Sequence, residues 1–386
     1  MELAKKCNVS NMQQIRLSSS WFGEEEIAAV SRVLKSHIVS MGIETKLFEE
    51  ELHKFWGRKD SGVTCVNSCS AALQLSLQAS GIKRGDEVIV PTYTFVATFQ
   101  AVTANGAIPI PCDVDLDDGF ISMDDAKKRL TQKTRAIIPV LFAGIDSKIE
   151  KVYQFAEENK LIVIEDAAHC FGNQNIAKRD GILCFSFDPI KNISCGDGGC
   201  VLTSQNEVTE RLKDIRLLGV IGDTDRRFQG LRSFEFDVVE QGWRLHMNNI
   251  AAAIGRVQLA KFHIIQEKRQ KNANMYIENL SDIEGIRPLP INVKTAVPHI
   301  FPIIITNGKR DELKAFLSEK GIETGVQYKP NHLLSYFNRG YDLPNACNFY
   351  ESILSIPVHP LLREDEVLYV IDCIKEFFYV TKNQIF

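Results

Sequence analysis

The sequence predicts an α/β protein with a large domain built on a mostly parallel central sheet and a smaller C-terminal α+β domain. Short, β-rich apolar runs alternate with helical patterns through residues 70–187, which is typical of a sheet flanked by helices. Several of these runs are apolar at successive positions, which indicates strands that are covered on both faces. Around Met247–Asn279 the pattern changes to one long helical stretch, whose length suits a connector between two domains.

The elements of the large domain follow from this alternation in chain order. The expected strands are DEVIVP (86–91), AIPIPCDVD (107–115), RAIIPVLFAG (135–144), KLIVIED (160–166) and ILCFSF (182–187). The expected helices between them are SAALQLSLQAS (70–80), TFQAVTANG (98–106), SMDDAKKRL (122–130) and SKIEKVYQFAEEN (147–159).

The segment after the long helical stretch predicts the smaller domain. It contains strand signals (IRPLP and PHIFPIIIT), a helix signal (KRDELKAFLSEKG) and a final helix (REDEVLYVIDCIKEFF). We therefore expect a large domain over residues 15–250, and a connecting helix with a small domain over residues 251–386.

Composition and charge narrow the class of protein. Forty-five basic and forty-nine acidic side chains give a net charge of −4, which favours neither nucleic acid nor an anionic membrane as a partner. The N-terminal segment has no apolar core of a secretory signal, and no run of eighteen apolar residues occurs. The ten cysteines include no CxxC pair, so we expect reduced thiols, no metal site and a cytoplasmic protein.

Two candidate ligand-binding positions follow apolar runs, where open α/β sheets bind ligands. Asp166 ends the run LIVIED. A buried carboxylate there needs a cation such as a protonated ring nitrogen, although a strand-end aspartate that caps a turn is the simpler interpretation of this residue alone. The segment NSCSAALQL begins a helix, and its amides form a candidate anion site together with the hydroxyls of Ser68 and Ser70. Plain N-capping explains these residues equally well. Neither GxxxxGK[ST] nor GxGxxG occurs, so no P-loop or dinucleotide motif supplies a phosphate site.

Two further candidates complete the set. Phe95 presents a flat ring for stacking, or is an ordinary core aromatic. Lys191 lies between an apolar run and a glycine cluster in FSFDPIKNISCGDGG, and taken alone it is most simply a solvated lysine. An amine that attacks a carbonyl must be neutral part of the time, and burial and nearby positive charge achieve this. Together, an aromatic ring, a carboxylate, a helix N-terminus and a lysine are the contacts that pyridoxal 5'-phosphate (PLP) requires.

These segments carry a resemblance to a known family. The sequence resembles the sugar aminotransferases of the fold-type I PLP-dependent superfamily, the DegT/StrS group, from about Ile15 to the final helix. The most specific matching segments are PTYTFVAT, IEDAAHCFG, FSFDPIKNISCGDGGCV and GWRLHMNNIAAAIGRVQL.

The resemblance implies a role for each matching residue at the cofactor ring. Lys191 matches the catalytic lysine, which binds the cofactor aldehyde covalently and moves a proton between the cofactor and substrate carbons. Asp166 matches the partner of the pyridine nitrogen, and Phe95 matches the stacking aromatic. His169 matches a position near the ring oxygen, and a metal role for it is disfavoured.

The resemblance also implies a phosphate site and a shared active site. Ser186, Ser70 and the Ala71 amide match the groups that bind the cofactor phosphate. Arg244, assigned to cofactor binding, and His246, assigned to substrate binding, match a loop that reaches the active site of the neighbouring subunit in this family. A homodimer with shared active sites is therefore expected.

The substrate side departs from the family pattern. Leu141 replaces a frequent histidine, and Arg244 stands where Asn is common, which affects the choice of sugar more than the chemistry. Cys69-Ser70 replaces a usual Gly-Thr, which keeps a hydroxyl but loses the glycine. Tyr328 and His332, in YKPNH, are assigned to the substrate side, with a domain-closing loop as an equal alternative.

The implied reaction is the transfer of an amino group from an amino acid, with L-glutamate expected, to a nucleotide-linked keto-sugar, giving an amino-sugar. The alternatives are a non-catalytic or regulatory PLP-binding protein, a sugar dehydratase on the same fold, and an oxidoreductase. Lys191 argues against the dehydratases, which have histidine there, and the missing dinucleotide motif argues against the oxidoreductase. The nucleotide, the C3 or C4 position of the keto group and the pathway stay open.

Overall fold

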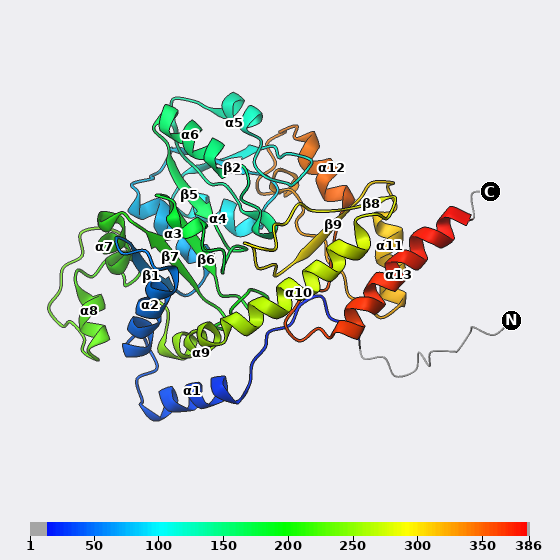
Figure 1. Ribbon diagram of the computed structural model, residues 1–386. Coiled ribbons are helices and arrows are strands. Elements are labelled where there is room, and N and C mark those ends of the chain that lie inside the picture. Colours follow the sequence, from blue (N-terminus) through cyan, green and yellow to red (C-terminus); the bar gives the residue numbers. More distant parts are fainter. Residues whose placement is uncertain (1–13, 384–386) are drawn as a thin grey trace.

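The central sheet of the computed structural model, which describes residues 14–383, has seven strands in the order β1-β7-β6-β5-β4-β2-β3 (Figure 1). The strands are β1 (Gly62–Val66), β2 (Glu87–Pro91), β3 (Ile108–Cys112), β4 (Thr134–Ile137), β5 (Ile162–Asp166), β6 (Ile182–Ser186) and β7 (Gly199–Thr203). Strands β3, β2, β4, β5 and β6 run parallel to one another, while β7 is antiparallel to both β1 and β6. The predicted α/β class with a mostly parallel central sheet is confirmed.

Both faces of this sheet are covered by helices. Successive residues of one strand belong to different buried clusters: Leu183 lies in the cluster on one face, and Ile182 and Cys184 lie in the cluster on the other. Helices α2 (Ile43–Trp56), α5 (Met123–Arg129), α6 (Ile149–Asn159) and α9 (Asn249–Ala260) cover the first face; α3 (Cys69–Ala79), α4 (Val96–Ala104) and α7 (Asn206–Ile215) cover the second. The doubly apolar runs in the sequence reflect this double burial.

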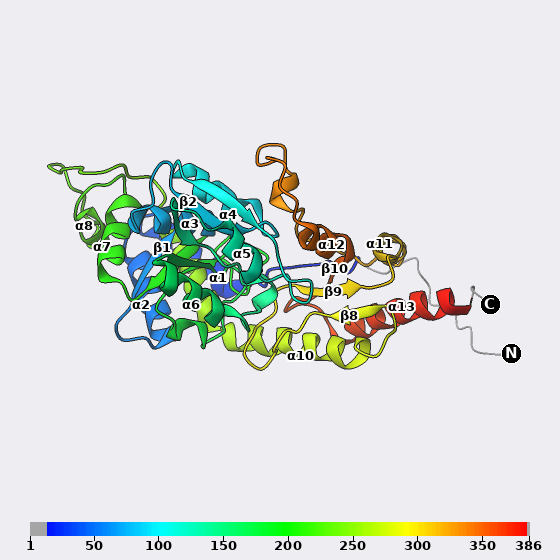
Figure 2. The same cartoon turned by 90° about the horizontal axis from the view of Figure 1, so that it is seen from above.

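A second, three-stranded antiparallel sheet lies beyond the large one, with the strand order β10-β9-β8. Its elements are β8 (Ile286–Pro288), β9 (Phe301–Ile305), β10 (Ile353–Ile356), and helices α10 (Phe262–Leu280), α11 (Arg310–Glu319), α12 (Pro344–Ser352) and α13 (Glu364–Asn383). Figure 2 shows this part extending from the large sheet, with α10 running between the two. The remaining helices, α1 (Glu24–Lys35) and α8 (Asp223–Phe228), lie at the periphery of the large sheet (Figure 1).

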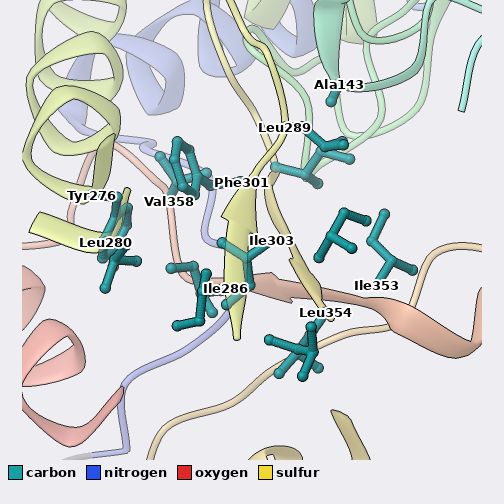
Figure 3. Packing of buried hydrophobic residues seen from close by; sticks show 14 of the residues in the cluster. Ala143, Tyr276, Leu280, Ile286, Leu289, Phe301, Ile303, Ile353, Leu354 and Val358 are labelled. Carbon is teal, nitrogen blue, oxygen red and sulfur yellow. The ribbon is translucent and has the colours of Figure 1, made fainter. Parts of the chain in front are cut away.

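One continuous apolar cluster joins the small sheet to the large one. Phe301, Ile303 and Ile353 of the small sheet pack in the same cluster as Ala143, which comes from the loop after β4 (Figure 3). Ile15 belongs to this cluster as well and forms a bridge with Ile322, which follows α11, so Ile15 packs against the small domain. The domain boundary at residue 250 stays a prediction.

Two predicted elements are wrong in extent. The single helical stretch over residues 247–279 is two helices that meet at Lys261, whose backbone lies outside the helical region (φ −97°, ψ 9°). The break separates two packing partners, because α9 packs against α1 and α2, whereas α10 packs against α13 and β8. Lys261 also pairs with Glu26 of α1 at 2.5 Å, which fixes the corner between the two helices.

The predicted strand over residues 135–144 ends early. Strand β4 stops at Ile137, two residues before Pro139, which has no N–H for a sheet ladder. The chain then turns through a short 3-10 segment (Phe142–Gly144), in which Ala143 takes a left-handed conformation with φ 53°. This turn brings the Ala143 amide to the side chain of His169.

Candidate active site

A cavity of about 270 Å³ opens at the carboxyl ends of β5 and β6. Its wall contains residues from the start of α3, the β2–α4 loop, the loops after β5 and β6, and the 328 region of the small domain. They are Ser68, Cys69, Ser70, Leu73, Thr94, Phe95, Ala97, Val140, Asp166, Ala168, His169, Ser186, Asp188, Ile190, Lys191, Asp197, Gly198 and Tyr328. This is the position at which open α/β sheets bind ligands.

Asp166, the last residue of β5, places a buried carboxylate in the cavity wall. Its Oδ2 accepts a hydrogen bond from Thr98 Oγ1 at 2.8 Å, and its Oδ1 accepts one from the Ala168 amide at 3.2 Å. Burial raises the pKa of this carboxyl, while the two hydrogen bonds and the charge of Lys191 lower it in part. Among the described residues no cation forms an ion pair with Asp166. The site therefore holds an aligned carboxylate that lacks a positively charged partner.

Lys191 extends from the loop after β6 into the same cavity. Its amide donates to the Asp188 carbonyl, which closes a turn at the end of the strand. Burial lowers the pKa of its amine, and the thiol of Cys69 and the carboxylates of Asp166 and Asp188 oppose that shift. An amine with a lowered pKa is neutral in a larger fraction of molecules and is the better nucleophile at neutral pH.

His169 and Tyr328 form a fixed pair in the cavity wall. His169 Nδ1 accepts a hydrogen bond from the Ala143 amide at 3.1 Å, and its Nε2 lies 3.3 Å from the Tyr328 hydroxyl. Burial and the charge of Lys191 hold the pKa of His169 well below its usual value, so the ring is neutral with its proton on Nε2. The Phe95 ring lies 5.6 Å from the Tyr328 ring and is 56% exposed, which leaves a face free for a ligand.

Hydroxyl groups line one part of the cavity at the start of α3. Ser68 caps this helix, accepting a hydrogen bond from the Ala71 amide at 3.1 Å, and Ser70 lies in its first turn. Ser186, at the end of β6, reaches the same cavity, and its Oγ accepts a hydrogen bond from the Asp188 amide at 3.3 Å. The Ala71 side chain is buried and is not part of the cavity wall. A helix N-terminus with these hydroxyls suits a phosphate group.

Gly199 permits this arrangement because it lets β7 approach the start of α3. A Cβ at this position would lie 2.7 Å from both the Cys69 nitrogen and the Ser68 carbonyl carbon, which are backbone atoms that cannot move aside cheaply. We expect Gly199→Ala to lower the free energy of unfolding by roughly 1–3 kcal/mol through overpacking and to weaken cofactor binding. Urea unfolding and titration with PLP measure the two effects.

Gly196→Ala is the matched control for this prediction. Its Cβ would meet nothing within 4 Å, but the backbone has a positive φ of 82°, so only conformational strain is added. We expect an unfolding cost of about 1–2 kcal/mol with unchanged PLP affinity. If Gly199→Ala bound PLP as tightly as the wild type, the proposed role of the close approach between β7 and the start of α3 would be contradicted.

In addition to Ala71, three predicted site residues lie outside the cavity wall of their own chain. Arg244 is exposed and pairs its backbone with Leu217. His246 is half-buried, and burial together with neighbouring arginines lowers its pKa to about 4. His332 is buried, with its Nδ1 2.9 Å from Thr92 Oγ1. The assignment of Arg244 and His246 to the site of a neighbouring subunit stays a prediction.

Other residues of the site were missed by sequence reasoning. Thr98, which donates a hydrogen bond to Asp166, follows Phe95 by one helical turn. Because α4 begins at the cavity, this spacing could have indicated Thr98 as a site residue. Asp188 and Asp197 flank Lys191 in the motif and lie in the cavity wall. His299, whose Nε2 lies 3.2 Å from Lys191 Nζ, comes from the small domain, and nothing in PHIFPIIIT distinguishes it from an ordinary strand histidine.

The residues present fit PLP. The unpaired buried carboxylate of Asp166 suits a protonated ring nitrogen, the helix N-terminus and serine hydroxyls suit a phosphate, and the amine of Lys191 suits an aldehyde. Within residues 14–383 no group of three histidine, cysteine or acidic side chains is arranged to hold a metal ion.

Comparison with known proteins agrees with this fit. Residues 21–375 match the model of the DegT/DnrJ/EryC1/StrS aminotransferase family. The spore coat polysaccharide biosynthesis protein SpsC of Bacillus subtilis is 31% identical over 371 residues, which cover 92% of this chain and 94% of SpsC.

Solved structures show the same relationship. PseC of Helicobacter pylori, an aminotransferase involved in the biosynthesis of pseudoaminic acid, superimposes with a TM-score of 0.86 at 27% identity, covering 95% of this chain and 100% of PseC. Spr1654 of Streptococcus pneumoniae, at 27% identity, gives a TM-score of 0.85 in its PLP form (96% of this chain, 99% of Spr1654) and 0.86 in its PMP form (96% and 98%). The chain belongs to the DegT/DnrJ/EryC1/StrS family and is a PLP-dependent sugar aminotransferase.

Proposed function

We propose that this enzyme transfers an amino group from L-glutamate to a nucleotide-linked keto-sugar and so produces a nucleotide-linked amino-sugar. The observation that carries the proposal is the convergence of Lys191 and Asp166 on one cavity that also contains the serine hydroxyls at the start of α3. The names of SpsC and PseC place those relatives in the biosynthesis of sugar-containing products, which supports a similar substrate class here.

The chain's own residues supply binding and proton transfer. When bound, PLP supplies an aldehyde that takes up the amino group and a ring that accepts electrons from the substrate carbon. The amine of Lys191 holds and moves the proton that leaves this carbon. The carboxylate of Asp166 holds a proton at the ring nitrogen, and Ser70 and Ser186 orient the ring by binding the phosphate.

Substrate access involves the exposed side of the cavity. The exposed face of Phe95 would stack on the cofactor ring, and Tyr328, fixed by His169, lies beside Phe95 on the small-domain side. We assign Tyr328 and His332 to the substrate side on this basis, because both come from the segment that brings the small domain to the cavity mouth.

We also propose a homodimer with shared active sites. The segment around residues 218–239 exposes many large apolar side chains, including Phe234, which is 90% exposed, and Val239, which is 72% exposed. The others are Leu218, Ile221, Leu231, Phe236 and Val238. A second copy would cover this surface, and Arg244 and His246 follow it directly in the chain.

A reducing, cytoplasmic location agrees with the thiol chemistry. The nine cysteines within the described range are all unbridged, as expected where thiols stay reduced. No helix of residues 14–383 has the length and apolarity to cross a membrane.

The test uses full-length protein loaded with PLP. We expect L-glutamate to bleach the visible absorption band of the bound cofactor and a nucleotide-linked keto-sugar to restore it, with an amino-sugar product identified by mass. A panel of nucleotides, C3- and C4-keto-sugars and the matching free sugars, with L-aspartate as a second donor, resolves substrate and donor. Equal activity on the free sugars would contradict the nucleotide-linked assignment, and failure of glutamate to bleach the band would contradict the donor.

A further inference from the structure

His299 comes from the small domain and lies at hydrogen-bond distance from the reacting amine. It precedes β9, is only 2% exposed, and its Nε2 lies 3.2 Å from Lys191 Nζ. Nothing in the proposed function uses it. A buried imidazole at hydrogen-bond distance from a catalytic amine affects both the orientation of the amine and the affinity of the amine for a proton.

The backbone on both sides of this contact is held by buried side chains. Asn192, next to Lys191, donates from Nδ2 to the Val297 carbonyl at 2.8 Å and to the Phe171 carbonyl at 2.7 Å. Arg269 donates to the carbonyl of Lys191 at 3.3 Å and to that of Pro298 at 3.4 Å. The segments that carry Lys191 and His299 are therefore tied together by two independent side chains.

The charges around His299 keep its ring neutral. Burial holds its pKa well below the usual value, and the charges of Lys191 and Arg269 lower it further. Arg269 is 1% exposed and has no carboxylate partner among the described residues, so its positive charge acts on its surroundings without compensation. A neutral imidazole has one nitrogen that accepts a hydrogen bond, and the nitrogen facing the amine is Nε2.

We propose that His299 is a positioning residue that accepts a hydrogen bond from the Lys191 amine and holds this amine, when it is not bonded to the cofactor, in line for proton transfer. The proposal rests on the proposed role of Lys191. The groups that face the amine from the other elements are Cys69, Asp166 and Asp188, and they act on its charge, while His299 fixes its direction from the small domain.

Substitutions of His299 distinguish a role in aligning the Lys191 amine from a role in packing alone. His299→Leu removes the acceptor, and His299→Gln places an amide oxygen near the former Nε2. We expect His299→Leu to lower kcat about 100-fold and to leave KM nearly unchanged, because a small misplacement of a reacting group causes a loss of this size. We expect His299→Gln to recover most of the lost kcat. His359→Leu, which removes another buried histidine outside the cavity, controls for lost stability.

A second readout does not depend on turnover. In full-length protein freed of cofactor, the pH dependence of Lys191 modification by an amine-reactive sulfonate, followed by peptide mass spectrometry, gives the apparent pKa of the amine. We expect His299→Leu to lower this midpoint by roughly one pH unit, because an acceptor stabilises the charged form, and His299→Gln and His359→Leu to leave it in place. Should His299→Leu fail to fold, His299→Asn, whose amide ends short of Nε2, gives the same measurement.

Failure of this proposal is distinguishable from failure of the proposed function. Borohydride reduction of the wild-type holoenzyme, followed by peptide mapping, shows whether the cofactor is bonded to Lys191. Absence of that bond overturns the role of Lys191. Presence of the bond, with a wild-type midpoint and wild-type kcat in His299→Leu or His299→Asn, overturns the role of His299 alone.

Discussion

Replacement of Lys191 by alanine is expected to lower turnover by about 1000-fold or more, since this amine both bonds to the cofactor and moves the substrate proton. The residue lies in the wall of the cavity that also contains Asp166. Removing the side chain leaves the start of α3 and the serine hydroxyls in place, so PLP still binds through its phosphate. We therefore expect a variant that retains cofactor without a covalent bond.

Three measurements check this prediction. Borohydride reduction should leave no cofactor on the peptide that contains residue 191, PLP titration should still saturate, and single-turnover bleaching with glutamate should be slowed. Small exogenous amines should restore part of the rate, because they can carry the missing proton in the emptied space. Lys178→Ala, which removes an exposed lysine of the same domain, is the control and should behave as wild type. Full turnover in Lys191→Ala would refute the assigned role.

The architecture was largely predictable because burial on both faces leaves a clear pattern in the sequence. The run ILCFSF is apolar except for Ser186, and in the structure Leu183 and Cys184 pack into different clusters on opposite faces of the sheet. The break at Lys261 left no such pattern, because both halves of the stretch are good helices and only their different packing partners separate them.

The candidate site was predictable where one segment contains both the residue and its setting. Asp166 is the last residue of one strand and Lys191 lies in the loop after the next strand, so sequence position alone brings them to one edge of the sheet. His299 is 108 residues from Lys191, and its contact depends on how the small domain docks. Sequence periodicity holds no information about that docking, so the partner of the catalytic amine could come only from the structure.

Replacement of Asp166 by asparagine is expected to lower kcat by about 100- to 1000-fold, comparable to the loss of a preorganised electrostatic partner, while the cofactor stays bonded to Lys191. Asparagine keeps the size of the side chain and can still bond to Thr98 and to the Ala168 amide, so the loss isolates the negative charge. Without that charge a proton at the ring nitrogen has no buried counter-ion, and its desolvation is uncompensated.

The control for this prediction is Thr98→Ala, which removes one hydrogen bond to the carboxylate but keeps its charge. We expect a loss of roughly 10-fold, because orientation is weakened and the ion pair remains. A PLP analogue methylated at the ring nitrogen carries a permanent positive charge and should restore part of the rate of Asp166→Asn, since it no longer needs a carboxylate to hold a proton. If the asparagine variant turned over like the wild type, the carboxylate would not be the partner of the ring nitrogen, and the orientation of the cofactor in this cavity would have to be reversed.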